Sequence, residues 1–322
     1  MREPVGRPTT AVIIPTRGVS ARTDGQERVL AVTAIETLLG HCGSDIDEIL
    51  VVFDAETPAA ARDAITRAGA GKVRAVEFSG EFNFARKINI AAVRTDADYL
   101  LLLNDDVEIE SPDTVRILSG YLEDGSVGLV APLLLFGDGT VQSAGHLLNP
   151  APYDLYRGYP ADSAGGANIL KVAREVSSVI AAVALTRRKD FIEAGGLCED
   201  FPGDYNDVDY ALKLALLGKR TVITPYVRCR HLESKTRRAV PDSGSIARLG
   251  ARWQAIIEND PLGNPALQRY EFVWKADIGT EWALEEAVGR RVTWDREEWD
   301  RLRSSADPRP HRTMYFPQKL VG

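Results

Sequence analysis

The 322-residue sequence has few cysteines and no surplus of positive charge. Its three cysteines are far apart and odd in number, which argues against a disulfide framework or a zinc site and favours a reducing cytoplasm. Lysine and arginine total 39 against 46 aspartate and glutamate residues, a net charge of −7. Nucleic-acid binders usually carry a basic surplus, so we expect no nucleic-acid partner.

Long hydrophobic runs are also missing. The longest, VIAAVAL near residue 179, is too short to cross a bilayer, and the N-terminus has no signal-peptide pattern. We therefore expect a soluble cytoplasmic protein, for which a peripheral contact with the inner membrane face stays open. No G-x-G-x-x-G motif follows the first expected strand, which counts against a nicotinamide or flavin enzyme.

Short β-branched runs alternate with helical patterns through the first 230 residues. This alternation is typical of βαβ units and predicts an α/β fold with a mainly parallel sheet. Strands are expected over residues 11–16, 48–54, 73–78 and 99–105, the last two fully buried. Helices are expected after the first and second of these strands. We assign residues 1–231 to this domain.

The composition changes beyond residue 231. Residues 232–250 are polar, charged and interrupted by proline and glycine, so we expect a mobile lid loop. All five tryptophans fall in the last quarter of the chain. Residues 251–322 are accordingly predicted to be a small C-terminal helical subdomain ending in an extended arm. Most of these tryptophans are expected in core or subunit packing, which leaves a homodimer through this part open.

Polar side chains follow three of the expected strands at the point where each ends. These are Thr16 and Arg17, Asp54, and the Asn-Asp-Asp run of residues 104–106. Ligands of parallel α/β sheets bind outside the carboxyl ends of the strands. The three ends therefore predict one pocket.

The carboxylates of Asp105 and Asp106 are adjacent and cannot both stay ionised cheaply without a counter-charge. Mg²⁺ or Mn²⁺, often shared with substrate phosphates, is the usual partner of such oxygen ligands. A turn or helix cap is the alternative, because Asn and Asp favour those positions. This stretch alone does not separate the two interpretations.

A second polar cluster begins the stretch 204–220, whose apolar residues recur at the spacing of a half-buried helix. Asp204, Asn206 and Asp207 lie at its N-terminal end, where capping is the ordinary role of such residues. The cluster is larger than a cap needs, so one carboxylate is a candidate general base. His231 ends the next apolar strand and gains weight as a ligand only if it lies near Asp106.

Several motifs then follow in the order found in one family. The stretches VIIPTRG, FNFARKINIAA, YLLLLNDDVEI, VQSAGHLL, NDVDYALKLALLGKRTVITPYVRCRHLES and NDPLGNPAL resemble family-two inverting glycosyltransferases. The resemblance extends over most of residues 10–270 and is nearest to the bacterial subgroup that builds surface polysaccharides and related glycans. It implies the GT-A fold, a Rossmann-like, mixed but mostly parallel sheet flanked by helices.

The resemblance also implies an activity. It predicts Mn²⁺- or Mg²⁺-dependent transfer of a hexose or deoxyhexose from a nucleoside diphosphate, with UDP- or dTDP-sugars favoured. The acceptor would be a hydroxyl of a glycan, a lipid-linked molecule or a small molecule. A non-catalytic nucleotide-sugar-binding protein and a sugar nucleotidyltransferase are the alternatives. The second would need a Gly-rich basic loop after the first strand, which IIPTRGVSARTDG does not supply.

By position in these motifs, Asp106 and His231 correspond to the metal site and Asp207 to the catalytic base. Donor-binding positions are Thr16, Arg17, Asp54, Asn83, Arg86, Asn104 and Asp105. Acceptor positions are Gln142, Ser143, His146 and Asp204. The sequence departs from the family at Ala181 and Ala182, where a Gly-containing turn is usual, so donor identity is left open.

Overall fold

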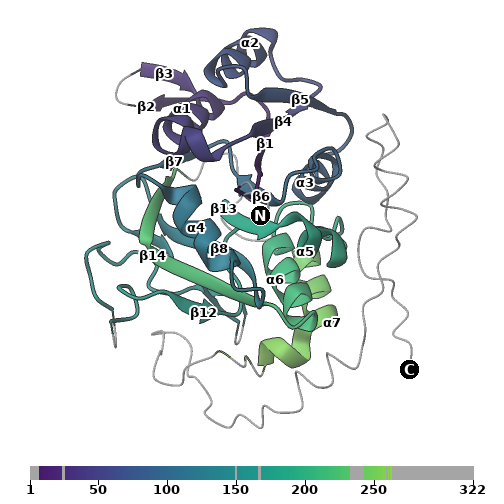
Figure 1. Cartoon of the computed structure of the whole chain (residues 1–322). Helices are drawn as coiled ribbons and strands as arrows, with labels where there is room; N and C mark the ends of the chain where they lie inside the picture. The colour runs from purple at the N-terminus through teal and green to yellow at the C-terminus, as the bar shows by residue number, and fades with distance from the viewer. Residues whose placement is uncertain are drawn as a thin grey trace, which may run out of the picture.

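A computed structural model describes residues 7–23, 26–148, 151–165, 168–232, 243–258, 260 and 262. Its centre is a ten-stranded sheet with helices on both faces (Figure 1). The order along the sheet is β12-β14-β8-β13-β6-β1-β4-β5, with β7 beside β14 and β9 beside β8. The strands are β1 (Thr10–Thr16), β4 (Glu48–Asp54), β5 (Val73–Phe78), β6 (Tyr99–Leu103), β7 (Val107–Ile109), β8 (Val127–Leu135), β9 (Val141–Ser143), β12 (Arg174–Val176), β13 (Val183–Arg187) and β14 (Arg220–His231).

Apart from α7, which packs on α6, the described helices form two layers over this sheet. They are α1 (Leu30–Cys42), α2 (Ala59–Ala68), α3 (Phe84–Ala92), α4 (Thr114–Leu122), α5 (Arg188–Glu193), α6 (Asn206–Leu216) and α7 (Ser243–Glu258). One core cluster joins the sheet to α1, α2 and α4, and a second joins its other face to α3, α5 and α6. Two short hairpins, β2 (Ser20–Thr23) with β3 (Gln26–Val29) and β10 (His146–Leu147) with β11 (Tyr153–Asp154), lie outside the sheet.

The sheet is mixed, because β13 runs antiparallel at its centre and the short strands β7, β9 and β12 are also antiparallel to their neighbours. β1, β4, β5 and β6 run parallel to one another, as do β8 and β14, whereas β13 runs antiparallel between β6 and β8. Val183 pairs with Leu103, so the chain entering β13 lies beside the chain leaving β6. The Asn104 N–H donates to the Ala182 carbonyl at 2.8 Å. Residues 180–182 are thereby held at the carboxyl end of β6.

The predicted fold class is confirmed, and two predicted burial patterns are wrong. Residues 73–78 were expected to be fully buried, but only Val76 and Phe78 are, because β5 is the edge strand of this sheet. The helix after residue 204 was expected to be half-buried. Seven of its residues from Val208 to Leu214 are buried, because α7 covers the face of α6 that points away from the sheet.

The prediction of a lid loop over residues 232–250 is also wrong in part. Residues 233–242 lie outside the described residues, but residues 243–250 form the first turns of α7. Leu249, Trp253 and Ile256 recur at helical spacing and pack against Val208 of α6, so this segment joins the core. Most of the predicted C-terminal subdomain, its arm and its other tryptophans lie outside the described residues. Among the described helices, none has both the length and the apolar character of a membrane span.

Candidate functional site

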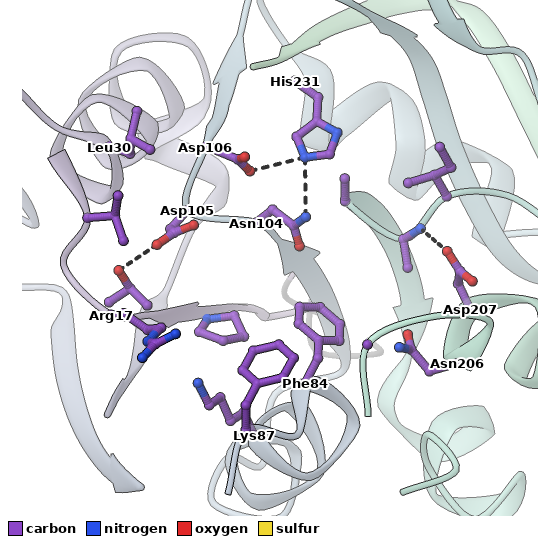
Figure 2. Close-up of a pocket in the computed structure, with 18 of the residues that line it drawn as sticks. Arg17, Leu30, Phe84, Lys87, Asn104, Asp105, Asp106, Asn206, Asp207 and His231 are labelled. Atoms are coloured by element: carbon purple, nitrogen blue, oxygen red, sulfur yellow. Dashed lines mark hydrogen bonds and ion pairs between the residues drawn. The ribbon is translucent and has the colours of Figure 1, made fainter. Parts of the chain in front are cut away.

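A pocket of about 410 Å³ opens at the carboxyl ends of β1 and β6 (Figure 2). It is bounded by the turn after β1, the segment before α3, the run after β6, residues 180–182 and the start of α6. Its lining includes ten polar residues: Thr16, Arg17, Lys87, Asn104, Asp105, Asp106, Asp204, Asn206, Asp207 and His231. The prediction of a pocket at converging strand ends is therefore confirmed for β1 and β6, whereas Asp54, at the end of β4, is not among the lining residues.

The turn after β1 fixes Thr16 and Arg17. The Thr16 hydroxyl donates to Asp105 Oδ2 at 2.6 Å and accepts from the Gly18 N–H at 2.9 Å. Gly18 has a φ of +70°, and a Cβ there would lie 2.9 Å from carbon atoms of both Ala61 and Thr57. Glycine is required on both counts. The turn therefore couples the end of β1 to the carboxylate that follows β6.

Asp54, at the end of β4, is paired with two cations. Arg17 Nε lies 3.5 Å from Asp54 Oδ2, and the buried Lys87 ammonium contacts Asp54 Oδ1. Burial lowers the pKa of Lys87, and the bond to Asp54 opposes that effect. The Lys87 ammonium also lies 5.0 Å from the ring centre of Phe82, which is 54% exposed at the pocket.

Sequence reasoning missed Lys87. The available signal was a lysine on the apolar side of α3, between Ala85 and Ile88, both of which are buried. A buried ammonium needs an anion, and Asp54 is one of the few carboxylates that strand order places nearby. Asn83 and Arg86, which were predicted instead, bond to Glu199 and are not among the lining residues.

Asn104, Asp106 and His231 point toward one another (Figure 2). His231 Nε2 lies 3.0 Å from Asp106 Oδ1 and 3.4 Å from Asn104 Nδ2. Asn104 Oδ1 is buried and accepts no hydrogen bond. His231 reaches the cluster because β14 ends beside β7, where it pairs with Val107, and the Leu232 N–H donates to the Asp106 carbonyl at 3.0 Å. The condition set for His231, proximity to Asp106, is met.

The adjacent carboxylates Asp105 and Asp106 have too little positive charge around them. Burial and the neighbouring Asp106 carboxylate raise the pKa of Asp105 to about 6, despite the Thr16 hydrogen bond and the charges of Lys87 and His231. A cation bound here would relieve that repulsion. The donor set of imidazole, carboxylate and an orphaned amide oxygen fits a divalent ion such as Mn²⁺.

The protein supplies only part of a coordination shell. Across the described ranges, no group of three His, Cys, Asp or Glu side chains is placed to hold a metal ion. Asp106 and His231 would be the two direct ligands of this kind, and Asn104 Oδ1 an additional neutral oxygen. Mg²⁺ and Mn²⁺ commonly complete such sites with water and substrate phosphate oxygens. The residues therefore fit an ion that is shared with a substrate.

Asp207 lies on another wall of the pocket, in the first turn of α6. Its Oδ1 accepts from the Val208 N–H at 2.8 Å and its Oδ2 from the Ala181 N–H at 3.3 Å. Tyr205, immediately before the helix, adopts a left-handed conformation with φ +64°. That turn directs Asp204 and Asp207 to the same cavity.

The structure does not bring the other predicted acceptor residues to the pocket. Gln142, Ser143 and His146 are buried and are absent from its lining. His146 Nδ1 lies 2.7 Å from the Ser178 hydroxyl, and Nε2 lies 3.3 Å from Asp154 Oδ1. Their segment forms β9 and β10 behind the cavity, because its apolar residues pack in a small cluster of their own.

No protein-family model matches the chain. The chain is 29% identical over 282 residues to an uncharacterised protein, y4gI, of Sinorhizobium fredii, which covers 83% of this chain and 30% of that protein. It is 29% identical over 274 residues to the O-antigen biosynthesis protein RfbC of Myxococcus xanthus, covering 83% of this chain and 21% of that protein. The chain thus spans less than a third of the length of either relative.

Two solved structures share its fold. GalNAc-T7, crystallised with UDP, GalNAc and Mn²⁺, superposes with a TM-score of 0.58 at 12% identity, covering 78% of this chain and 50% of that one. The mannosyltransferase PcManGT of Pyrobaculum calidifontis, in complex with GDP-Man and Mn²⁺, gives 0.50 at 19% identity, covering 80% and 64%. The chain therefore has the GT-A fold of these glycosyltransferases, and the predicted resemblance is confirmed at the level of the fold.

Proposed function

We propose that this chain is a glycosyltransferase domain that moves a sugar from a nucleoside diphosphate to an acceptor hydroxyl with inversion. The observation that carries the proposal is the presence of two separate acidic centres in one pocket. Asp106 follows β6 and contacts His231 at the end of β14, whereas Asp207 lies in the first turn of α6 (Figure 2). A single displacement needs groups on both faces of the anomeric carbon, one for the leaving diphosphate and one for the incoming hydroxyl.

The donor half would use the ends of β1, β4 and β6. Thr16, Arg17 and Asp54 would hold the nucleoside, while Asp106 and His231 would hold Mn²⁺ or Mg²⁺. When bound, the cation stabilises the negative charge of the departing diphosphate as a Lewis acid. Lys87 keeps the Asp54 carboxylate in place and adds positive charge to this side of the pocket.

The acceptor half would use Asp207. Its carboxylate takes the proton of the acceptor hydroxyl as that oxygen bonds to the anomeric carbon, and the bond to the diphosphate breaks on the opposite face. The two backbone N–H groups that bond to Asp207 fix its orientation. Asp204 lines the same region and is a candidate contact for the acceptor.

The proposal extends to the classes of donor and acceptor. A UDP- or dTDP-sugar remains the favoured donor, and one structural neighbour carries UDP while the other carries GDP-Man. The name of the relative RfbC, an O-antigen biosynthesis protein, supports a glycan or lipid-linked acceptor. A peripheral contact with the membrane and a homodimer are further parts of this proposal.

Calorimetry with UDP-, dTDP- and GDP-sugars, with and without Mn²⁺, tests the donor half. We expect one nucleotide class to bind only in the presence of Mn²⁺. Asp106→Ala removes a direct ligand, so it should weaken Mn²⁺-dependent binding at least tenfold, about 1.4 kcal/mol. Binding of every nucleotide without metal dependence would contradict the proposed donor site. Binding without any transfer would favour a non-catalytic nucleotide-sugar protein.

A further inference from the structure

Gln142 makes a hydrogen-bond contact with the ring of His231. Its side chain is 1% exposed, and its Oε1 lies 2.9 Å from His231 Nδ1. An amide oxygen can only accept a hydrogen bond, so Nδ1 must carry a proton to make this contact. In a neutral imidazole the other nitrogen, Nε2, then bears a lone pair.

That lone pair faces the candidate metal site. His231 Nε2 lies 3.0 Å from Asp106 Oδ1. An unprotonated ring nitrogen and a carboxylate oxygen are both acceptors, so they attract each other only through a shared proton or cation. The Asn104 amide makes a long contact of 3.4 Å with Nε2 and reaches it from a different side than Asp106 does (Figure 2). The arrangement matches the metal sites in which a second residue holds the far nitrogen of a ligating histidine.

We propose that Gln142 is a positioning residue for the metal site, which holds His231 in the Nδ1–H tautomer with Nε2 directed at the ion. The inference rests on the proposed function for the identity of the bound ion. The proton on Nδ1, which the contact with Gln142 Oε1 requires, depends on neither metal nor nucleotide. This role replaces the predicted contact of Gln142 with an acceptor.

The backbone of β9 supports this role. In the antiparallel pair of β8 and β9, Leu134 pairs with Ser143 but Leu135 pairs with Val141. Gln142 is therefore the extra residue of a β-bulge, a distortion that redirects a side chain relative to regular pairing. Its neighbours Leu135, Val141 and Ala144 are buried and apolar. An amide in such surroundings is costly without a partner, and His231 supplies it.

The partners come from opposite sides of one strand. β9 pairs with the end of β8 on one side, and β14 pairs with the same residues, Leu134 and Leu135, on the other. Gln142 and His231 are 89 positions apart in sequence and are joined across that strand. The bulge thus places a residue of the VQSAG motif behind the metal site, on the side away from the cavity.

The first test reads the tautomer directly. Protein labelled with ¹⁵N-histidine is examined by long-range ¹H–¹⁵N NMR near pH 8.5, about two units above the ordinary histidine pKa, without metal or nucleotide. We expect wild-type His231 to be protonated at Nδ1, with its signal identified by its loss in His231→Gln. Gln142→Met, which keeps length but cannot accept in the same way, should lose this preference. Gln142→Glu should retain it, because a carboxylate also accepts from Nδ1–H.

The same spectra contain an internal control. The ring nitrogens of His146 contact Ser178 and Asp154, so its signals should be equal in the wild type and both variants. A change at His146 as large as that at His231 would show general disturbance of the fold and overturn the specific role. An Nε2–H tautomer of His231 in the wild-type protein would overturn the proposal outright.

The second test measures the ion. Mn²⁺ alone, and Mn²⁺ with UDP or GDP, is titrated by electron paramagnetic resonance of the free ion. We expect Gln142→Met to weaken Mn²⁺ binding about 10- to 100-fold, as for other residues that hold a metal ligand, and Gln142→Glu to restore most of it. Gln254→Leu, on the exposed side of α7, is the matched control and should bind as the wild type does. Wild-type affinity in Gln142→Met would overturn the metal role. If no nucleotide binds to the wild type or to any variant, the proposed function fails. The role of Gln142 in setting the His231 tautomer is then still decided by the NMR measurement.

Discussion

Replacing Asp207 by Asn should separate catalysis from binding. The change removes the carboxylate proposed as the base and leaves the donor half of the pocket intact. Asp207 lies in the first turn of α6, whereas Asp106 and His231 lie at the ends of β6 and β14. We therefore expect donor and Mn²⁺ to bind to the variant within about threefold of wild type, a difference of about 0.7 kcal/mol.

The hydrogen bonds of Asp207 set the expected cost in stability. The Asn oxygen can keep the shorter bond, from the Val208 N–H at 2.8 Å, while its NH₂ group would face the Ala181 N–H that now donates at 3.3 Å. One long hydrogen bond is lost, about 0.5–1.5 kcal/mol. For a domain of this size that lowers Tm by about 1–6 °C. Loss of a general base lowers the rate by about 10²- to 10⁴-fold, or about 2.7–5.4 kcal/mol.

The assay uses the donor selected by calorimetry and follows release of the nucleoside diphosphate in the presence of acceptor. Asp204→Asn is the matched control, because it removes a carboxylate of the same pocket three positions earlier. We expect a loss of less than tenfold in that variant. A rate of Asp207→Asn within tenfold of wild type, combined with a larger loss in Asp204→Asn, would refute the assignment and transfer the role to Asp204.

Two further changes test the framework of the site. Gly18→Ala places a Cβ at φ +70° and 2.9 Å from two neighbouring side chains, so it should lower the free energy of unfolding by more than the about 1–2 kcal/mol of a left-handed residue. Gly71→Ala is the control, because Gly71 has a φ of +82° but lies in open space, and it should be less destabilising. The Tm values of both variants check this. Burial lowers the pKa of His146, but the Asp154 carboxylate and the charge of Asp207 outweigh it and raise the pKa. Because the folded pKa is raised, His146 contributes full stability below about pH 6.5, its unfolded pKa, and loses it as pH rises through the folded pKa. Urea unfolding of wild type at increasing pH should show this decline, and His146→Gln should flatten it.

The sequence predicted the pocket because a parallel sheet brings strand ends together whatever the loops between them do. Thr16 and Asp105 needed only the assignment of β1 and β6, whereas Asp54, at the end of β4, is not among the lining residues. The contact of Asp207 with the same pocket followed from the family motif. Its bond to the Ala181 N–H did not, since it depends on the direction of β13.

Other features depend on contacts that local patterns do not encode. Lysine is a hydrophilic residue, and the burial of Lys87 is explained by two contacts, one with the sheet below α3 and one with the Asp54 carboxylate. One face of β5 is exposed because β5 is the edge strand of the sheet. The residues of a strand do not reveal whether that strand lies at an edge. The family motif predicts that Gln142 lies near the entry of the acceptor. In the structure a one-residue bulge in β9 directs its side chain to His231 instead.

The direction of β13 explains how one sheet presents both halves of the site. A parallel strand beside β6 would bring its own carboxyl end to the pocket. The antiparallel β13 instead brings the chain that precedes it, and Ala181 and Ala182 thereby form a wall beside Asn104. The Ala181 N–H then bonds to Asp207, so the orientation of the proposed base depends on the register between β6 and β13. Because both alanines are buried, a larger side chain at either position would have to enter the pocket or displace α6. The space left for the donor sugar and the position of the base are therefore set by the same short segment.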